Sequence, residues 1–161
     1  MRLTDVLLED MVLLDEDSFQ TKDDLFKEMA GRFYRAGVTT SEEAFYRALY
    51  ERENEGPTVF AEYELAIPHG ICDEVVRPGV GFVRLKEPML YQSCGEEGLV
   101  RYIFMLAIEG GNSEARNEHL QLLAQVARLM MHEEFREILA TTATYESMVA
   151  EIQNYTNEDE E

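Results

Sequence analysis

The sequence has little of what marks a disulfide-rich, membrane-spanning or disordered protein. Its 161 residues include two cysteines, four prolines and no tryptophan. Two cysteines do not make the dense framework of a small secreted protein, and no apolar run reaches the roughly 18 residues that a membrane helix needs. The N-terminal residues turn acidic at Asp5 without an apolar segment. We therefore expect no signal peptide and a cytoplasmic protein.

Positive charge is also scarce. Lysine and arginine number 14 against 33 aspartates and glutamates, which gives a formal net charge of −19. A surface this acidic repels nucleic-acid phosphates, so direct binding of DNA or RNA is not expected. The same charge suits a basic protein partner through electrostatic steering, although it also serves solubility.

The length and apolar content are sufficient for one hydrophobic core. Hydrophobic residues make up 45% of the chain, and domains commonly contain about 100–200 residues. A chain of this size buries about 68–70% of the surface that it exposes when unfolded. We predict one domain over residues 1–154 and an acidic C-terminal tail over residues 155–161.

Helical patterns alternate with short apolar runs along the chain. We predict strands over 12–14, 65–67, 80–85 and 100–108, the last of them central and buried. We predict helices over about 21–36, 40–54, 114–131, 133–140 and 145–153. Thr21 would cap the first helix, and Thr40 with Glu43 would form a capping box for the second. This order indicates a three-layer α/β/α sandwich with a mixed, mainly parallel central sheet.

His69 is the most informative of the three histidines. It follows a predicted strand that Pro68 ends, and Gly70 after it allows a close backbone approach. An imidazole at the carboxyl end of a strand lies where α/β sheets usually bind ligands. A loop histidine with a structural role is the alternative interpretation.

His119 and Arg52 are two further candidates. His119 lies on the predicted third helix, over residues 114–131. The inward residues of that helix would be Leu120, Leu123 and Ala127, so His119 would sit half-buried at the edge of that face. Arg52 lies near the end of the second helix. It either forms a surface ion pair with a neighbouring glutamate, which stabilises little, or enters the same crevice and binds anionic oxygens.

Together these side chains fit phosphoryl transfer. A neutral imidazole is a good nucleophile toward phosphorus, and such transfer needs little beyond positioning and charge stabilisation. A second histidine can fix the tautomer of the first or bind the phosphoryl oxygens. The rival interpretation is a metal site at His69-x-x-Cys72. The chain has no second Cys-x-x-Cys or His-x-x-x-His pair, so we expect no metal and no cofactor.

These residues also occur in an order that resembles a known family. The segments are Ala66-Ile67-Pro68-His69-Gly70, Arg52-Glu53 before it, Glu118-His119-Leu120-x-x-Leu123 after it, and Gly81 to Pro88 between. They resemble enzyme IIA of the mannitol/fructose type, a component of the bacterial phosphoenolpyruvate-dependent sugar phosphotransferase system. The resemblance covers nearly the whole chain. Arg52-Glu53-x-x-x-Pro57-Thr58 is similar to the galactitol-type branch instead.

The resemblance implies a role for each candidate. His69 would be the phosphorylated histidine, His119 the second active-site histidine and Arg52 the active-site arginine. The donor would be the phosphocarrier HPr, and the acceptor a cysteine of enzyme IIB. Enzyme IIC would then carry fructose, mannitol or galactitol across the membrane with coupled phosphorylation. The alternative within the same family is a regulatory module that controls partners by its phosphorylation state.

Overall fold

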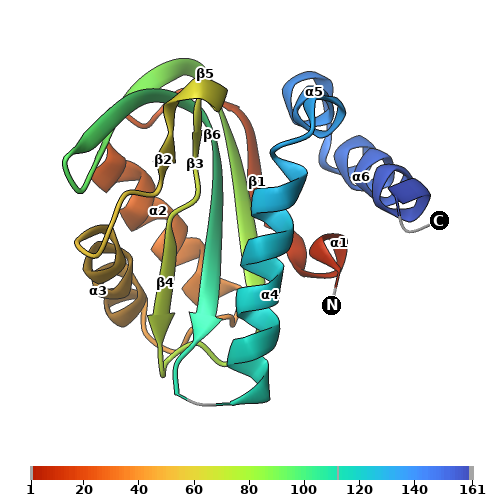
Figure 1. Cartoon of the computed structure of the whole chain (residues 1–161). Coiled ribbons are helices and arrows are strands. Elements are labelled where there is room, and N and C mark those ends of the chain that lie inside the picture. The colour runs from red at the N-terminus through yellow and green to blue at the C-terminus, as the bar shows by residue number, and fades with distance from the viewer. Residues whose placement is uncertain (1, 112, 160–161) are drawn as a thin grey trace.

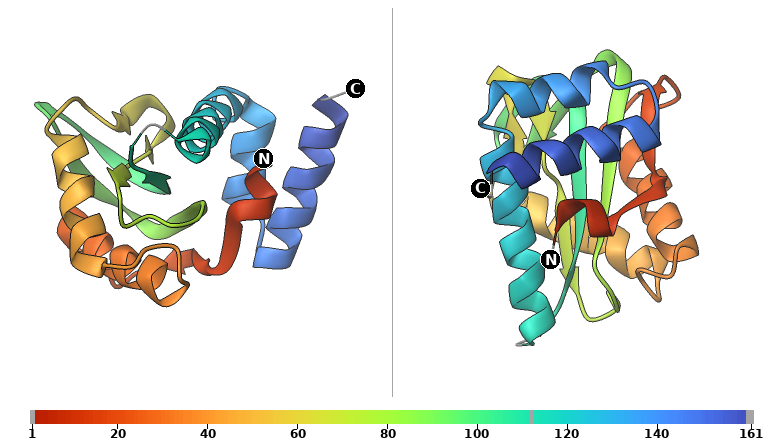
Figure 2. Two further views of the ribbon diagram at one scale, coloured as in Figure 1. Left: turned by 90° about the horizontal axis from the view of Figure 1, so that it is seen from below. Right: turned by 90° about the vertical axis from the view of Figure 1, so that its right-hand side faces the viewer.

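The computed structural model describes residues 2–111 and 113–159, the last three of them as backbone only (Figure 1). Helices cover both faces of one sheet, as predicted (Figure 2). Helices α2 (Lys22–Arg35) and α3 (Glu42–Glu53) lie on one face. The other face is covered by α1 (Leu3–Val6), α4 (Glu114–Leu129), α5 (Glu133–Thr141) and α6 (Tyr145–Asp159).

The sheet is mixed. Its strands are β1 (Leu7–Glu16), β2 (Val59–Phe60), β3 (Leu65–Ala66), β4 (His69–Cys72), β5 (Gly79–Ser93) and β6 (Glu96–Glu109). The order is β1-β5-β6-β3-β2, and β4 also pairs with β6. The pairs β1/β5, β3/β6 and β4/β6 are parallel. The pairs β5/β6 and β2/β3 are antiparallel. Most pairings are therefore parallel, but β5/β6 is the most extensive.

Strand β5 runs well beyond its predicted end at Leu85. The polar residues Lys86 and Glu87 and then Pro88 end the apolar run, which is why the sequence indicates a shorter strand. A register shift against β6 between Arg84 and Met89 accommodates this stretch, as expected of a proline inside a strand. The extension matters because it carries Tyr91 and Ser93 to the end of α3.

The helix caps confirm one prediction and correct another. The Thr21 hydroxyl accepts a hydrogen bond from the backbone N–H of Asp24, as predicted. The predicted capping box of Thr40 with Glu43 is wrong, because α3 begins one residue later and Ser41 caps it through the N–H of Ala44. The N–H and hydroxyl of Thr40 donate instead to the carbonyl of Glu74.

The inward face of α4 differs from the prediction by about one residue. Its buried residues are His119, Leu122, Val126 and Leu129, whereas Leu120 is 37% exposed. The apolar pattern alone misplaces this face because the histidine counts as polar. His119 therefore lies toward the sheet and not at the edge of the helix.

The C-terminal helix crosses the predicted domain boundary at residue 154. Helix α6 continues to Asp159, past its predicted end near residue 153. The Tyr155 ring lies 6.0 Å from that of Phe135, so the first residue of the predicted tail packs on the domain. Residues 160 and 161 of that tail lie outside the described residues.

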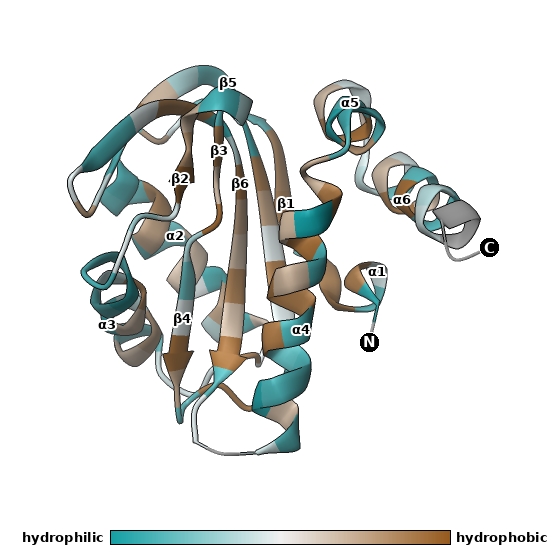
Figure 3. Cartoon of the chain, viewed as in Figure 1, coloured by the Kyte–Doolittle hydropathy of each residue, from teal (hydrophilic) through white to brown (hydrophobic). Residues whose placement is uncertain are grey.

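Two apolar clusters fill the layers on either side of the sheet. One lies under α2 and α3 and includes Phe26 and Phe45; the other lies under α1 and α4–α6 and includes Phe104 and Phe135. The hydropathy colouring shows apolar residues along the central strands and the helix sides that face them (Figure 3). Each fully buried side chain of this size stabilises by about 1.5–3 kcal/mol. Across the described ranges, no helix is both long and apolar enough to span a membrane.

Candidate active site

His69 is placed by a break in the strand that precedes it. Strand β3 ends at Ala66, and β4 begins at His69; both run parallel to β6. Pro68 between them has no N–H, but its carbonyl accepts from the N–H of Leu106, so the chain stays against β6. His69 thus begins a further strand, where the sequence indicates a loop beyond the sheet.

Gly70 shows toward which face His69 points. A Cβ atom at Gly70 would lie 2.8 Å from a ring carbon of Phe45 and 3.2 Å from the Cβ of Ala48, both on α3. That space admits only glycine. Because successive side chains of a strand point to opposite faces, His69 points toward the face that α4 covers, as does Ile71, which packs in the cluster under α4.

The two ring nitrogens of His69 have different partners. Nδ1 lies 3.2 Å from the carbonyl oxygen of Ile67, and Nε2 accepts a hydrogen bond of 3.0 Å from the Nε–H of Arg52. These partners assign the proton to Nδ1 and leave the lone pair on Nε2. Burial lowers the pKa of His69, and the Arg52 charge acts in the same direction against the raising effect of the Ile67 carbonyl. The imidazole is therefore held neutral.

Arg52 is directed into the site from the last turn of α3. Besides its bond to His69, its Nη1 donates to the carbonyl of Gly56 at 2.9 Å. The predicted alternative of a surface ion pair is therefore not what the structure shows. One guanidinium links the end of α3, the loop that follows it and the first residue of β4.

His119 lies on the same face of the sheet as His69 and is 2% exposed. Its Nδ1 accepts a hydrogen bond of 3.0 Å from the backbone N–H of Glu109, the last residue of β6. This bond assigns the proton to Nε2. Burial lowers the pKa of His119, while the charges of Glu109 and Glu118 oppose the shift. The site thus holds two neutral imidazoles and one guanidinium.

The structure brings Arg52 and His69 into direct contact. His119 is bonded to strand β6, which pairs with the strand of His69. His69 lies opposite Leu106 of β6, and the N–H that His119 binds belongs to Glu109, three residues further along β6. Both histidines therefore belong to the β4/β6 end of one face. An unprotonated Nε2 can act as a nucleophile toward phosphorus, and a guanidinium and a ring N–H donor can stabilise phosphoryl oxygens.

The metal alternative fails on geometry. Cys72 follows His69 by three residues in one strand, so the two side chains point to opposite faces. Cys72 packs with the cluster under α2 and α3. Burial raises the pKa of its thiol to about 11, whereas a metal ligand must be a thiolate. Among the described residues, no group of three or more His, Cys, Asp or Glu side chains is placed to hold a metal ion.

A buried polar cluster behind Arg52 was not predicted as functional. The carboxylate of Glu53 accepts hydrogen bonds from the Thr58 hydroxyl and from the ammonium group of Lys22. The Thr58 hydroxyl in turn contacts the hydroxyls of Tyr91 and Ser93. The segment Arg52-Glu53-x-x-x-Pro57-Thr58 was the available signal, since it places an acid and a hydroxyl on either side of a short loop. The partners from α2 and β5 are distant in sequence, which no local pattern reveals.

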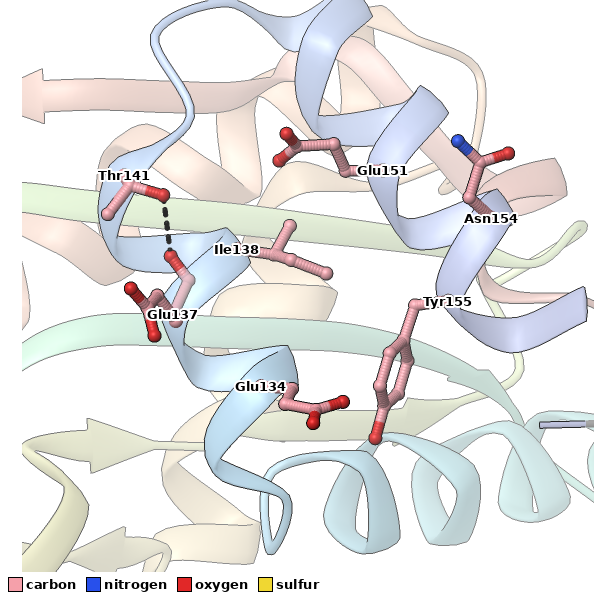
Figure 4. Close-up of a pocket in the computed structure, with 7 residues that line it drawn as sticks. All are labelled: Glu134, Glu137, Ile138, Thr141, Glu151, Asn154 and Tyr155. Atoms are coloured by element: carbon pink, nitrogen blue, oxygen red, sulfur yellow. Dashed lines mark hydrogen bonds between the residues drawn. The ribbon is translucent and has the colours of Figure 1, made fainter. Parts of the chain in front are cut away.

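One hollow of the surface lies away from these residues. It has a volume of about 410 Å³ and lies between α5 and α6 (Figure 4). Its lining residues are Glu134, Glu137, Ile138, Thr141, Glu151, Asn154 and Tyr155. Three carboxylates line it, and it shares no residue with the His69 site.

Comparison with known proteins identifies the family of the chain. Residues 5–155 match the model of the family described as phosphoenolpyruvate-dependent sugar phosphotransferase system, EIIA 2. The fructose-specific EIIABC component of Bacillus subtilis is 28% identical over 149 residues, which are 92% of this chain but 22% of that protein. The fructose-specific EIIA component of Haloferax volcanii is 31% identical over 120 residues, covering 73% of this chain and 75% of that protein.

Solved structures share the fold. Nitrogen regulatory protein IIA-Ntr from Neisseria meningitidis superimposes with a TM-score of 0.77 at 27% identity, covering 92% of this chain and 97% of that one. Enzyme IIA-Mtl, in its complex with phosphorylated enzyme IIB-Mtl from Escherichia coli, superimposes with a TM-score of 0.68 at 21% identity. The match covers 89% of this chain and 96% of that one. With its match over residues 5–155, the chain belongs to the EIIA type 2 family of the phosphoenolpyruvate-dependent sugar phosphotransferase system and is a phosphotransferase component of the phosphocarrier type.

Proposed function

We propose that this protein accepts a phosphoryl group from phospho-HPr on Nε2 of His69 and passes it to a cysteine of enzyme IIB. The observation that carries the proposal is the 3.0 Å contact between Arg52 Nε–H and Nε2 of the buried, neutral His69. That contact marks the nitrogen whose lone pair is available. The bond from phosphorus to the donor breaks as the bond to Nε2 forms, and no proton has to leave the ring.

The neighbouring groups can stabilise the transferred phosphoryl group. Phosphorus takes the place of the Arg52 N–H at Nε2, and the guanidinium then turns its donors to the phosphoryl oxygens while Gly56 holds Nη1. The Ile67 carbonyl keeps the proton on Nδ1. His119 supplies its Nε2–H to a phosphoryl oxygen, because its Nδ1 is already bound to Glu109.

The partners follow from charge and from the relatives. A net charge of −19 favours encounter with a basic donor such as HPr. A protein of the same fold, enzyme IIA-Mtl, forms a complex with phosphorylated enzyme IIB-Mtl. Fructose-specific relatives favour fructose among the sugars that the sequence indicates, with enzyme IIC as the membrane partner.

A regulatory role is the second candidate. The similarity to IIA-Ntr favours it, as does a nitrogen regulatory protein of Bradyrhizobium diazoefficiens that is 30% identical over 99 residues. In that case His69 would still accept the phosphoryl group. Its phosphorylation state would then control a partner without feeding sugar uptake.

Incubation with phosphoenolpyruvate, enzyme I and HPr tests the proposal. Intact mass should rise by one phosphoryl group in the wild type and remain unchanged in His69→Ala. The control is His132→Ala, since His132 is exposed at the start of α5 and should not affect acceptance. Acceptance by His69→Ala would overturn the site assignment.

Addition of enzyme IIB then separates the two candidate functions. Transfer from the phosphorylated chain to a IIB cysteine supports sugar uptake. Retention of the phosphoryl group in the presence of IIB supports the regulatory role and contradicts the transport assignment.

A further inference from the structure

The loop after α3 is closed by two hydrogen bonds that start from consecutive residues. Arg52 and Glu53 are the last residues of the final turn of α3. The Arg52 Nη1 group donates to the carbonyl of Gly56 at 2.9 Å, and the Thr58 hydroxyl lies 2.5 Å from Glu53 Oε2. The same few residues therefore fix the direction of the guanidinium and the position of a buried carboxylate.

The carboxylate side of this loop lies in the interior. Glu53 and Thr58 are each 3% exposed. The Thr58 hydroxyl donates to Glu53 and lies 3.0 Å from the Tyr91 hydroxyl, while its backbone N–H donates to the Ser93 hydroxyl at 2.9 Å. A buried carboxylate is costly unless its oxygens are bonded. The conformation of the loop is therefore closely specified at Thr58.

The countercharge of Glu53 is held just as firmly. Lys22 Nζ lies 3.4 Å from Glu53 Oε1 and donates to the carbonyl of Gln92 at 2.6 Å. It also lies 5.3–5.7 Å from the ring centroids of Phe26, Tyr50 and Tyr91. A cation so close to three aromatic rings is stabilised by them. Helix α2 thus holds Glu53 through Lys22, and strand β5 holds Thr58 through Tyr91 and Ser93.

We propose that Thr58 is a positioning residue for Arg52. Its hydroxyl holds Glu53, the two together fix the loop, and the loop presents the Gly56 carbonyl that aims the guanidinium at Nε2 of His69. Among the described residues, the hydroxyl and the backbone N–H of Thr58 bond to Glu53, Tyr91 and Ser93 and not to either histidine. The effect on transfer rests on the proposed function, whereas the effect on the His69 ring does not.

The variant Thr58→Val removes the hydroxyl and keeps the shape of the side chain. The matched control is Thr142→Val, because Thr142 is also buried and its hydroxyl also donates a hydrogen bond, to the Ile138 carbonyl in α5. Nitrogen-15 NMR of histidine-labelled protein should show a changed Nε2 signal for His69 in Thr58→Val. The signal should stay at its wild-type position in Thr142→Val and return toward it in Thr58→Ser.

Kinetics give the second readout. We expect Thr58→Val to lower kcat for phosphoryl acceptance from phospho-HPr by about 10- to 100-fold, with KM for phospho-HPr unchanged. In an Arg52→Ala background the same substitution should have no further effect, since its action passes through Arg52. If Thr58→Val does not fold, the double variant Thr58→Val/Glu53→Gln takes its place, because it removes the buried charge together with its hydrogen-bond donor. The same loss of kcat is expected for it.

The outcomes separate this proposal from the proposed function. An unchanged His69 signal and unchanged kcat in Thr58→Val would overturn the positioning role, as would an equal loss with and without Arg52. If the wild type accepts no phosphoryl group, the proposed function fails, and the NMR signal of His69 alone decides for or against Thr58.

Discussion

The two helical layers differ in the contacts that surround the site residues. Behind Arg52 the contacts are polar and directional: the buried Glu53 is paired with Lys22. Nearer the surface, Asp23 of α2 accepts hydrogen bonds from both Tyr46 and Tyr50 of α3. Beneath α4 the contacts are mainly apolar, and His119 is fixed by one backbone N–H among leucines and valine. The guanidinium of the site comes from the polar layer, and the second histidine from the apolar layer.

This difference suggests how each layer serves the site. Hydrogen bonds have preferred directions, so a polar network can orient one guanidinium, whereas apolar packing places a ring without aiming it. Changes behind Arg52 should therefore alter both the chemistry and the stability, whereas under α4 the effects on packing and on chemistry should be separable. The following substitutions examine that contrast, from the largest expected effect to the smallest.

Arg52→Ala should slow phosphoryl acceptance by about 10²–10³-fold, the usual effect of removing one donor to developing negative charge. The measurement is the rate of mass gain from phospho-HPr. Arg47→Ala is the control on the same helix, because Arg47 forms an exposed ion pair with Glu43. Equal rates in the two variants would place the guanidinium outside the chemistry.

Lys22→Met should lower the free energy of unfolding by about 3 kcal/mol, because it leaves the buried Glu53 carboxylate without its countercharge. The midpoint of urea unfolding measures this change. Lys27→Met serves as the control, since the ion pair of Lys27 with Asp23 is exposed and its loss should shift the midpoint little. A midpoint for Lys22→Met as high as that of Lys27→Met would show that the polar layer does not depend on this charge.

Two substitutions at His119 separate its packing from its chemistry. His119→Asn keeps an acceptor near the N–H of Glu109 but removes the ring Nε2–H, whereas His119→Ala removes both. Both should slow phosphoryl acceptance by about 10- to 100-fold, as expected for one lost hydrogen bond to a charged group. Only His119→Ala should also lower the unfolding midpoint. Wild-type rates in His119→Asn would restrict the residue to a structural role.

The pH dependence is the smallest effect and has a definite sign. Burial lowers the pKa of both His69 and His119 below the ordinary value of 6.5. The unfolded chain therefore binds protons at a higher pH than the native chain. The stability associated with the neutral rings is complete above pH 6.5 and is lost as the pH falls through the lower native pKa values.

Proton NMR titration of the two imidazoles measures this directly. Both should titrate below pH 6.5. Because the neutral ring is the nucleophile, phosphoryl acceptance should stay constant from neutral pH down to about 6.5 before it declines. A native pKa above 6.5 for His69 would contradict the buried neutral ring.

The sequence was informative where the signal is local. The apolar run ending at Ile108 predicts the central strand, and the spacing within α2 predicts both its cap at Thr21 and its inward residues. Pro68 between an apolar pair and a histidine marks His69. These signals suffice because each depends on neighbouring residues alone.

The sequence was less informative where placement depends on distant residues. The phase of α4 is set by a hydrogen bond from Glu109 to His119, which makes a polar side chain part of the buried face. The cluster around Glu53 draws on Lys22 and Tyr91, 31 residues before and 38 after it, so no short pattern contains it. Contacts of this kind follow from the topology of the sheet.

The most direct test of the site is nitrogen-15 and phosphorus-31 NMR of the histidine-labelled chain after phosphorylation by enzyme I and HPr. The arrangement of Ile67, His69 and Arg52 predicts one phosphorus coupled to Nε2 of His69, with the proton retained on Nδ1. Coupling to Nδ1 of His69, or to either nitrogen of His119, would contradict the account.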